Sequence, residues 1–156
     1  SYENEGPMYI RLGKNGEPNI HSDGTRVEIG KSIQITDGKD LALISTSNTL
    51  ELAKQWVEEW KEDGISVLLI SMPSIKPFDK DSVEKLIVKK IPIFTLEEHN
   101  IIGGLGSAVA EIIAESGKSI NFKRIGINDT FSHHVGNHTY QREKFGLLKK
   151  PNFSKE

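Results

Sequence analysis

The stretch FTLEEHNIIGGLGSAVAEIIAES, residues 94–116, decides the fold. An apolar run that ends at Phe94 leads into two carboxylates and an imidazole, and three glycines then open a segment with helical apolar periodicity. This order predicts a strand, a tight polar turn and a helix that begins at the glycines. In open α/β sheets, ligands and partners gather where strands end in such turns, so this turn is the first candidate for function.

Composition bounds the class of protein. The chain has 156 residues, of which 36% are hydrophobic and 27% charged, as in an ordinary globular domain. The net charge of −2 gives no general attraction to nucleic acid or to an anionic membrane. The absence of cysteine excludes a disulfide scaffold and thiolate metal sites, and it fits a cytoplasmic protein. No apolar run approaches the roughly 20 residues of a membrane span.

Segments with strand character alternate with helical segments along the chain. Such βαβ units are right-handed and build a parallel sheet. The alternating segment 32–36 is predicted to add an antiparallel edge strand. The fold is therefore predicted to be a three-layer α/β/α domain with a mostly parallel sheet of five strands. The other four strands are predicted at 41–45, 65–70, 91–96 and 120–127.

Local signals place the helices between these strands. Asn48 is predicted to cap the first helix, with Glu51 in the capping-box position, and Gly64 to end it. Asp79 is predicted to cap the second. The third helix is predicted over 105–115, and a last amphipathic turn or two within 140–148.

The chain is predicted to divide into four parts. Residues 1–12 end in a short strand and are expected to close a preceding domain, and the glycine-rich segment 13–31 reads as a surface linker. The α/β domain is expected over 32–150, with a loose tail at 151–156. The chain has no initiator methionine, so we expect it to be cut from a larger protein.

The three glycines first suggest dinucleotide binding, because backbone amides after a strand can bind a pyrophosphate. The fingerprint fails, since the position of its third glycine, counted from Gly104, holds Val109, and no acidic residue ends a strand about 20 residues later. Gly103, Gly104 and Gly106 are instead predicted to let the helix approach the sheet closely. A small anionic ligand at this helix N-terminus remains an alternative.

Glu97, Glu98 and His99 could form an acid–base group, because a neighbouring carboxylate tunes the proton affinity of an imidazole. Adjacent residues of an extended segment point to opposite faces, so at most Glu97 and His99 face the same way. The favoured interpretation of these two residues, with the three glycines, is a structural turn or a subunit contact.

The sequence holds no complete catalytic set. His133, His134 and His138 form an HHxxxH pattern, but no HExxH helix or cysteine pair supports a metal site, and solvated loop histidines are predicted. No nucleophile elbow or phosphate-binding lysine loop is present. We therefore predict no catalytic residue and no metal ligand in this chain.

The segment EEHNIIGGLGSAVAEIIAE closely resembles the C-terminal domain of the transketolase family of thiamine diphosphate enzymes. Four further segments agree with that family in order and spacing: YIRL, GKDLALISTSNTLELA, GISVLLISMPSIKPFD and RIGINDTFSHHVGNHTYQREKFGL. The resemblance covers nearly the whole chain. Its SHHVGNH segment departs from the family's usual short loop, so no site is carried over onto those histidines.

The resemblance implies the third domain of a larger enzyme, with a mixed five-stranded sheet. Such enzymes transfer a two-carbon ketol unit between phosphorylated sugars. Thiamine diphosphate and Mg²⁺ would bind to the other domains, so this chain alone is expected to bind neither and to be inactive. Its expected role is dimer assembly and shaping of the substrate entrance, with the remaining domains, or an N-terminal subunit, as partners in a homodimer.

The resemblance also implies a role for one residue, and it leaves the kind of enzyme within the family open. Arg11 in YIRL matches a family arginine that contacts the substrate phosphate, a role that suits the fork of a guanidinium. The same domain occurs in deoxyxylulose-phosphate synthases and in 2-oxoacid dehydrogenase β subunits, and both remain open. A stand-alone regulatory module that binds a small anion is the alternative from another class of function.

Overall fold

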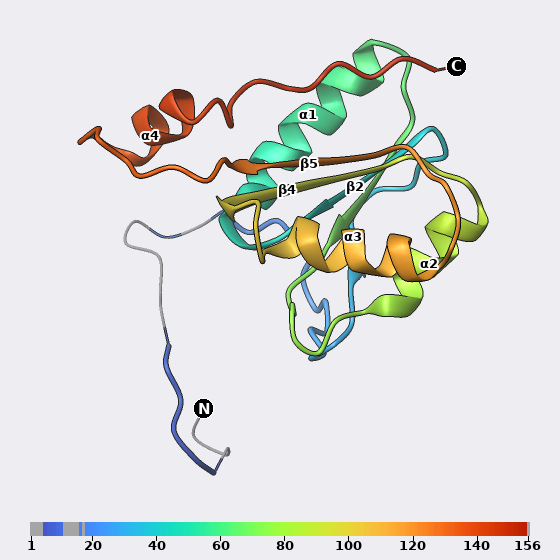
Figure 1. Ribbon diagram of the computed structural model, residues 1–156, viewed down its shortest axis with the longest axis horizontal. Helices are drawn as coiled ribbons and strands as arrows, with labels where there is room; N and C mark the ends of the chain where they lie inside the picture. Colours follow the sequence, from blue (N-terminus) through green and yellow to red (C-terminus); the bar gives the residue numbers. More distant parts are fainter. Residues whose placement is uncertain (1–4, 11–15, 17, 156) are drawn as a thin grey trace.

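The computed structural model describes residues 5–10, 16 and 18–155. The described residues form a five-stranded sheet, a short 3₁₀ turn and four α-helices (Figure 1). None of these helices has the length and apolar character needed to cross a membrane. The strands are β1 (Ile33–Gln34), β2 (Leu41–Ser45), β3 (Val67–Ser71), β4 (Ile93–Asn100) and β5 (Phe122–Ile127), and the helices are α1 (Leu50–Glu62), α2 (Lys80–Val88), α3 (Leu105–Glu115) and α4 (His138–Lys144).

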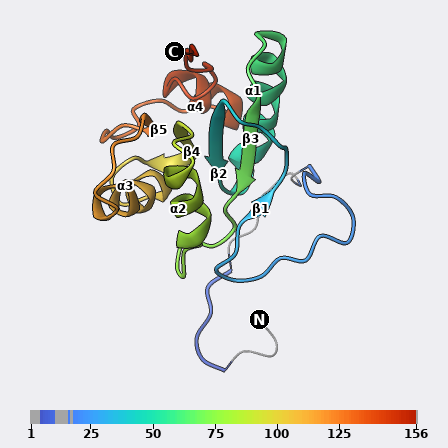
Figure 2. The same cartoon turned by 90° about the vertical axis from the view of Figure 1, so that its right-hand side faces the viewer.

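The sheet has the order β1-β3-β2-β4-β5. β2 runs parallel to both β3 and β4, and β4 runs parallel to β5. β1 alone is antiparallel, with Ile33 opposite Ser71 and Gln34 opposite Ile70 (Figure 2). The predicted mixed α/β fold and its antiparallel edge strand are therefore confirmed.

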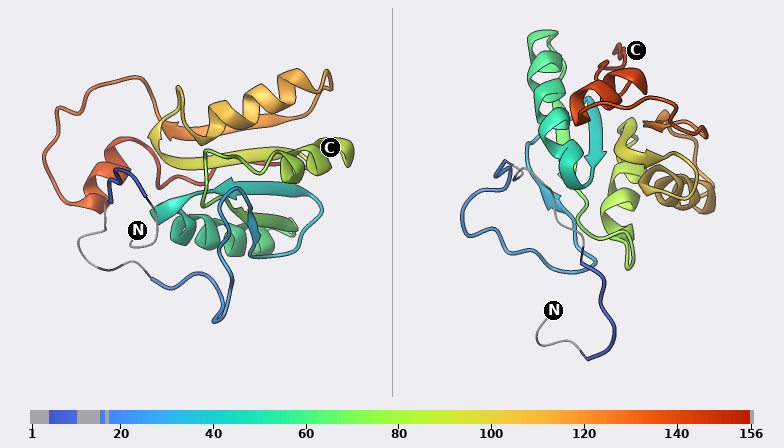
Figure 3. Two further views of the ribbon diagram at one scale, coloured as in Figure 1. Left: turned by 90° about the horizontal axis from the view of Figure 1, so that it is seen from below. Right: turned by 90° about the vertical axis from the view of Figure 1, so that its left-hand side faces the viewer.

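Helices cover both faces of the sheet, which makes three layers (Figure 3). β2 is fully buried because both of its faces are covered. Leu41 and Leu43 pack in one core cluster with α1, and Ala42 and Ile44 pack in the other with α2 and α3. The first cluster is rich in aromatic rings, since Trp56 and Trp60 of α1 both lie in it.

The start of α1 differs from the prediction. A 3₁₀ turn, Ser47–Thr49, precedes the helix, and its N-cap residue is Thr49, whose side chain makes no capping bond. The Thr49 hydroxyl instead donates to the Thr46 carbonyl at 2.7 Å. The prediction of Asn48 as a cap is therefore wrong, because Asn48 is the middle residue of this 3₁₀ turn and does not stand directly before the helix. The predicted end at Gly64 is confirmed, with a φ of 76°.

The second and third helices follow their local signals. The Asp79 carboxylate accepts a hydrogen bond from the backbone N–H of Ser82 at 3.3 Å and caps α2, as predicted. α3 begins and ends at the predicted residues. Their apolar faces close the second core cluster against β2 and β4.

The strand predicted at 91–96 extends beyond its apolar run. β4 continues to Asn100, so Glu97, Glu98 and His99 belong to a strand and not to the turn. The strand pairing explains this extension, because Asn100 still lies opposite Ile127 of β5 after a register shift that follows Leu96. The turn itself starts at Ile101.

The tail was expected to be loose, and for its described residues this is wrong. Phe153 packs edge-on against Phe94, with ring centroids 5.8 Å apart. Lys155 Nζ lies 2.8 Å from an Asp40 carboxylate oxygen. The hydrogen bond from Lys155, with one from the backbone of Ser66, keeps the pKa of Asp40 below its ordinary value. The tail therefore closes the α1 side of the core.

Candidate functional site at the start of α3

Glu97 occupies the entrance of α3. Its side chain points from β4 toward the helix and is only 2% exposed. One carboxylate oxygen accepts from the N–H of Leu105 and the other from the N–H of Gly106, both at 2.8 Å. The first amides of a helix have no partner within the helix and carry the positive end of its dipole. Glu97 therefore supplies the negative charge that this helix end attracts.

The glycines make room for this contact. A Cβ atom on Gly104 would overlap the Glu97 carboxylate, so a larger residue there must displace it. A Cβ on Gly106 would lie 2.7 Å from Cγ of Arg124, which is again too close. Gly103 is different, because a Cβ there would meet nothing within 4 Å and its φ is +80°. Close packing accounts for Gly104 and Gly106, and backbone conformation for Gly103.

Glu98 binds α4, which sequence reasoning missed. One of its oxygens lies 2.6 Å from Nε2 of His138, and the other accepts from Nε of Arg142 at 2.7 Å. Arg142 also donates to the backbone carbonyl of Asn48 at 3.1 Å. The predicted exposure of His138 is confirmed, but its predicted place in a loop is wrong, because it is the first residue of α4. No local pattern announces this cluster, because Glu98 and Arg142 are 44 residues apart.

His99 does not join Glu97 in an acid–base pair. Its ring is exposed, and Nδ1 lies 2.9 Å from the carbonyl oxygen of the next residue, Asn100. Glu97 faces the helix entrance instead. His133 and His134 are exposed in the segment between β5 and α4. In the described ranges, no three histidine or acidic side chains are arranged to hold a metal ion.

The segment that follows β4 and the segment that follows β5 lie side by side where these two strands end. Asn100 donates from its side-chain amide to Asp129 at 3.1 Å, which joins the end of β4 to the segment after β5. Large apolar side chains are exposed on both: Ile102 at 62%, Phe131 at 88% and Val135 at 98%. We call these three residues the carboxyl-edge surface. Each of the three lies in a segment that follows β4 or β5, and exposed apolar side chains of this size are candidates for a contact with another protein surface.

Arg11 lies outside the described residues, so its predicted contact with a substrate phosphate stays a prediction.

The fold and this site together define a class. The chain has a mixed five-stranded α/β domain whose glycine-rich helix entrance is closed by its own carboxylate. The family model described as "Transketolase, C-terminal domain" matches residues 30–148. The chain belongs to this family of transketolase C-terminal domains.

Relatives and solved structures agree with this assignment. A putative transketolase C-terminal section of Methanocaldococcus jannaschii is 40% identical over 131 residues, which make up 83% of this chain and 40% of that protein. A 1-deoxy-D-xylulose-5-phosphate synthase of Shouchella clausii is 33% identical, over 83% of this chain and 21% of that protein. A solved split gene transketolase, an inactive beta4 tetramer, matches with a TM-score of 0.83 and 34% identity, over 93% of this chain and 47% of that one. The chain thus spans less than half the length of each.

Proposed function

We propose that this chain is the non-catalytic C-terminal domain of a thiamine diphosphate-dependent, cytoplasmic enzyme that transfers a two-carbon ketol unit between phosphorylated sugars. Membership of the transketolase C-terminal domain family carries the proposal. The length of the relatives supports it, because this chain covers only 40% of the Methanocaldococcus jannaschii protein and 47% of the split gene transketolase. The proposed division into a preceding domain at 1–12, a linker at 13–31 and an α/β domain at 32–150 follows the same reasoning.

The cofactor is assigned to the rest of the intact enzyme. The glycine-rich start of α3 does not fit a diphosphate, because the amides that would bind one already donate to Glu97. A second negative charge there would meet a buried carboxylate. The same contact argues against a stand-alone module that binds an anion at Gly104. Thiamine diphosphate and Mg²⁺ are therefore proposed to bind to the other domains, where the cofactor supplies the nucleophilic carbon of the transfer.

The proposed role of this domain is assembly and shaping of the substrate entrance. The carboxyl-edge surface supports this role, since Phe131 and Val135 expose nearly their whole side chains. Glu98 and Arg142 hold α4 beside that surface, and Glu97 fixes the start of α3. His99 and Gly103, both exposed, are proposed to lie at the same contact, either with the preceding domains or with the second subunit of a homodimer.

The assembly role can be tested in the intact enzyme by changing Phe131 and Val135 together to serine. We expect a weaker dimer in sedimentation velocity, because the contact would lose most of its apolar area. Replacing Val88 and Ile75, two other exposed apolar residues, with serine is the matched control. Equal behaviour of the two double variants would contradict the proposed contact.

Arg11 is proposed to bind the phosphate of the substrate in the intact enzyme. Removing a bidentate donor weakens binding of a phosphorylated substrate without changing the chemistry. Arg11→Ala should therefore raise KM several-fold for a phosphorylated substrate and leave KM for an unphosphorylated analogue nearly unchanged. An unchanged KM for the phosphorylated substrate would remove the assignment.

The reaction is tested by the choice of donor. The intact enzyme, loaded with thiamine diphosphate and Mg²⁺, is offered a ketose phosphate or pyruvate, with an aldose phosphate as acceptor. Transfer of a two-carbon unit from the ketose supports the proposal. Release of CO₂ from pyruvate with formation of a deoxyketose phosphate would instead identify a synthase, the second candidate, which the match to the Shouchella clausii enzyme favours. Oxidation of a 2-oxoacid would identify a dehydrogenase.

A further inference from the structure

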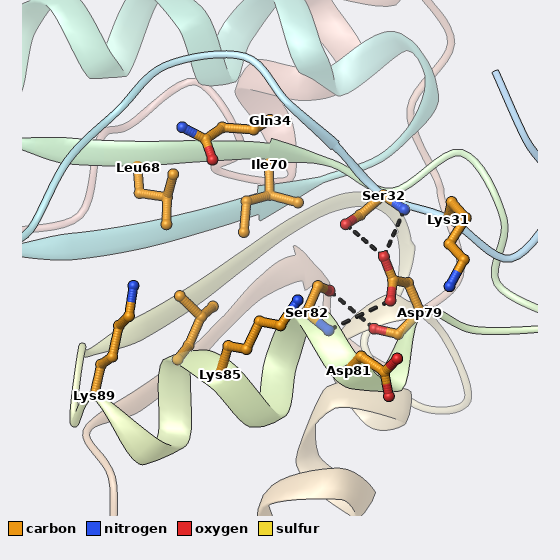
Figure 4. A pocket seen from close by; sticks show the side chains of 11 residues that line it. Lys31, Ser32, Gln34, Leu68, Ile70, Asp79, Asp81, Ser82, Lys85 and Lys89 are labelled. Carbon is orange, nitrogen blue, oxygen red and sulfur yellow. Dashed lines mark hydrogen bonds between the residues drawn. The ribbon is translucent and has the colours of Figure 1, made fainter. Parts of the chain in front are cut away.

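A groove of about 360 Å³ lies between α2 and the β1–β3 edge of the sheet, away from the start of α3 (Figure 4). The groove exists because β1 has only two residues and covers a short part of β3. Its volume is within the range of about 300 to 1,000 Å³ that is usual for small-molecule sites. Its floor is apolar and consists of Leu68, Ile70 and Leu86.

Two lysines of one helix face line this groove. Lys85 lies in the last turn of α2 and Lys89 follows the helix, four residues later. In Figure 4 the Lys89 side chain rises from α2 toward the strand side of the groove, whereas the Lys85 side chain runs along the groove toward Ser82. Among the described residues, neither ammonium group is paired with a carboxylate. Both ammonium groups are therefore available to an anion that enters the groove.

The acidic groups of the groove lie at the end that is far from Lys89, and Lys85 points toward them (Figure 4). The Asp79 carboxylate accepts hydrogen bonds from the backbone N–H of Ser32 at 2.8 Å and from its hydroxyl at 2.7 Å. Asp81 is exposed, and Figure 4 draws its carboxylate pointing away from Lys89. Lys31 lines the groove beside Asp79. The lining therefore carries three positive and two negative charges, in a protein whose net charge is −2.

Neutral polar groups stand between the lysines and Asp79. Gln34 of β1 offers an amide that both donates and accepts, and Figure 4 draws it above the groove. The Ser82 hydroxyl donates to the Asp79 carbonyl at 2.9 Å and keeps its lone pairs free to accept. An apolar floor with hydroxyl and amide partners along the rim is suited to the carbon backbone and hydroxyl groups of a polyol.

We propose that this groove binds a small hydroxylated anion of the sugar phosphate class. The phosphate binds within the groove to the ammonium groups of Lys85 and Lys89, the hydroxyls bond to Gln34 and Ser82, and the carbon chain lies on Leu86 and the strand residues of the floor. This site is separate from the start of α3, where Glu97 occupies the helix amides.

The test is a titration of the 156-residue chain with ribose 5-phosphate, followed by amide chemical shifts. Saturable shifts are expected for the residues that line the groove, and the K85Q/K89Q variant should weaken binding by at least about tenfold. The K85R/K89R variant should retain binding, because it keeps both charges. Ribose and inorganic phosphate are titrated separately, and each should bind more weakly than the ester that combines them.

A matched control removes the same charge elsewhere. Lys54 and Lys118 are exposed and lie outside the groove, so K54Q/K118Q lowers the net charge equally. This variant should bind ribose 5-phosphate as the unchanged chain does. Equal weakening in K54Q/K118Q, or shifts that do not saturate, would overturn the site. Binding of inorganic phosphate as strong as that of the ester would overturn the sugar phosphate class.

Discussion

A carboxylate accepts hydrogen bonds from the first backbone amides of both α2 and α3. The two carboxylates differ in position, because Asp79 directly precedes its helix and Glu97 lies in a strand of the sheet. Asp79 is the residue directly before α2 and reaches an amide three positions ahead. Glu97 belongs to β4 and reaches amides eight and nine positions ahead, across a turn. Asp79 thus caps α2 with one oxygen and accepts from Ser32, 47 residues earlier, with the other, whereas Glu97 gives both of its oxygens to the start of α3.

The difference predicts unequal contributions to stability. Asp79 satisfies one helix amide, the N–H of Ser82, over a long distance of 3.3 Å. A buried carboxylate that accepts two backbone hydrogen bonds leaves two unpaired amides in an apolar environment when it is removed. Three substitutions measure how far the two helix starts differ.

The largest effect is expected for Glu97→Ala. Hydrogen bonds to a charged group contribute about 1.5 to 3 kcal/mol each, so the loss of both should lower the free energy of unfolding by about 3 to 6 kcal/mol. Urea unfolding of the 156-residue chain, followed by circular dichroism, measures this value. Glu111→Ala, an exposed change on the same helix, should stay within about 0.5 kcal/mol of the unchanged chain. A Glu97→Ala loss no larger than that of Asp79→Ala would end the distinction between the two caps.

An intermediate effect is expected for Gly104→Ala. The new methyl group overlaps the Glu97 carboxylate and should cost about 1 to 3 kcal/mol. The same change should cost much less in the Glu97→Ala background, because the overlapping group is gone. Gly103→Ala is the matched control, since its cost is backbone strain at a positive φ and should be the same in both backgrounds. Additive costs for Gly104→Ala would show that it does not contact Glu97.

The smallest effect is expected for Asp79→Asn. Asparagine keeps only one of the two acceptor oxygens that serve Ser82 and Ser32, so the loss at neutral pH should be about 1 kcal/mol. The variant should instead change the acid dependence of stability. Burial opposes ionisation of Asp79, but the hydrogen bonds from Ser32 and Ser82 outweigh it, and the pKa of this carboxyl lies below its ordinary value.

The sign of this dependence follows from the lowered pKa. The unfolded chain takes up the proton at a higher pH than the folded one, so the contribution of Asp79 is complete above the ordinary pKa of about 3.8 and is lost as the pH falls through the folded value. The free energy of unfolding is measured at a series of pH values from about 5 downward, through the ordinary pKa of aspartate. It should fall less steeply with pH for Asp79→Asn than for the unchanged chain. Identical slopes for the two chains would contradict the assignment.

Sequence reasoning predicted the features that depend on neighbouring residues. The bounds of α3, the cap at Asp79 and the glycine exit at Gly64 each follow from signals within a few positions. The order of strands and helices also predicted the parallel sheet, because handedness limits how βαβ units can pack. The prediction for Asn48 shows where local reasoning ends, because the turn that excludes it from capping uses the Thr49 hydroxyl.

The site was predicted only in part, because its contacts depend on the sheet. The sequence singled out Glu97 and the glycines but placed them in a turn, since the apolar run stops before the strand does. Pairing with β5 extends β4 through Glu97 and aims its carboxylate at α3. The bond between Glu98 and Arg142 has no local signal, and the same holds for Phe153 on Phe94.

The sequence by itself therefore determined which segments are helices and strands, which of their faces are apolar, and the family resemblance. Periodicity and capping act over a few residues, so they can be read without coordinates. The tertiary structure alone decided what Glu97 and Glu98 bind, how the tail packs, and that Lys85, Lys89 and Gln34 line one groove. These contacts join distant segments through the strand order, and no spacing along the chain encodes that order directly.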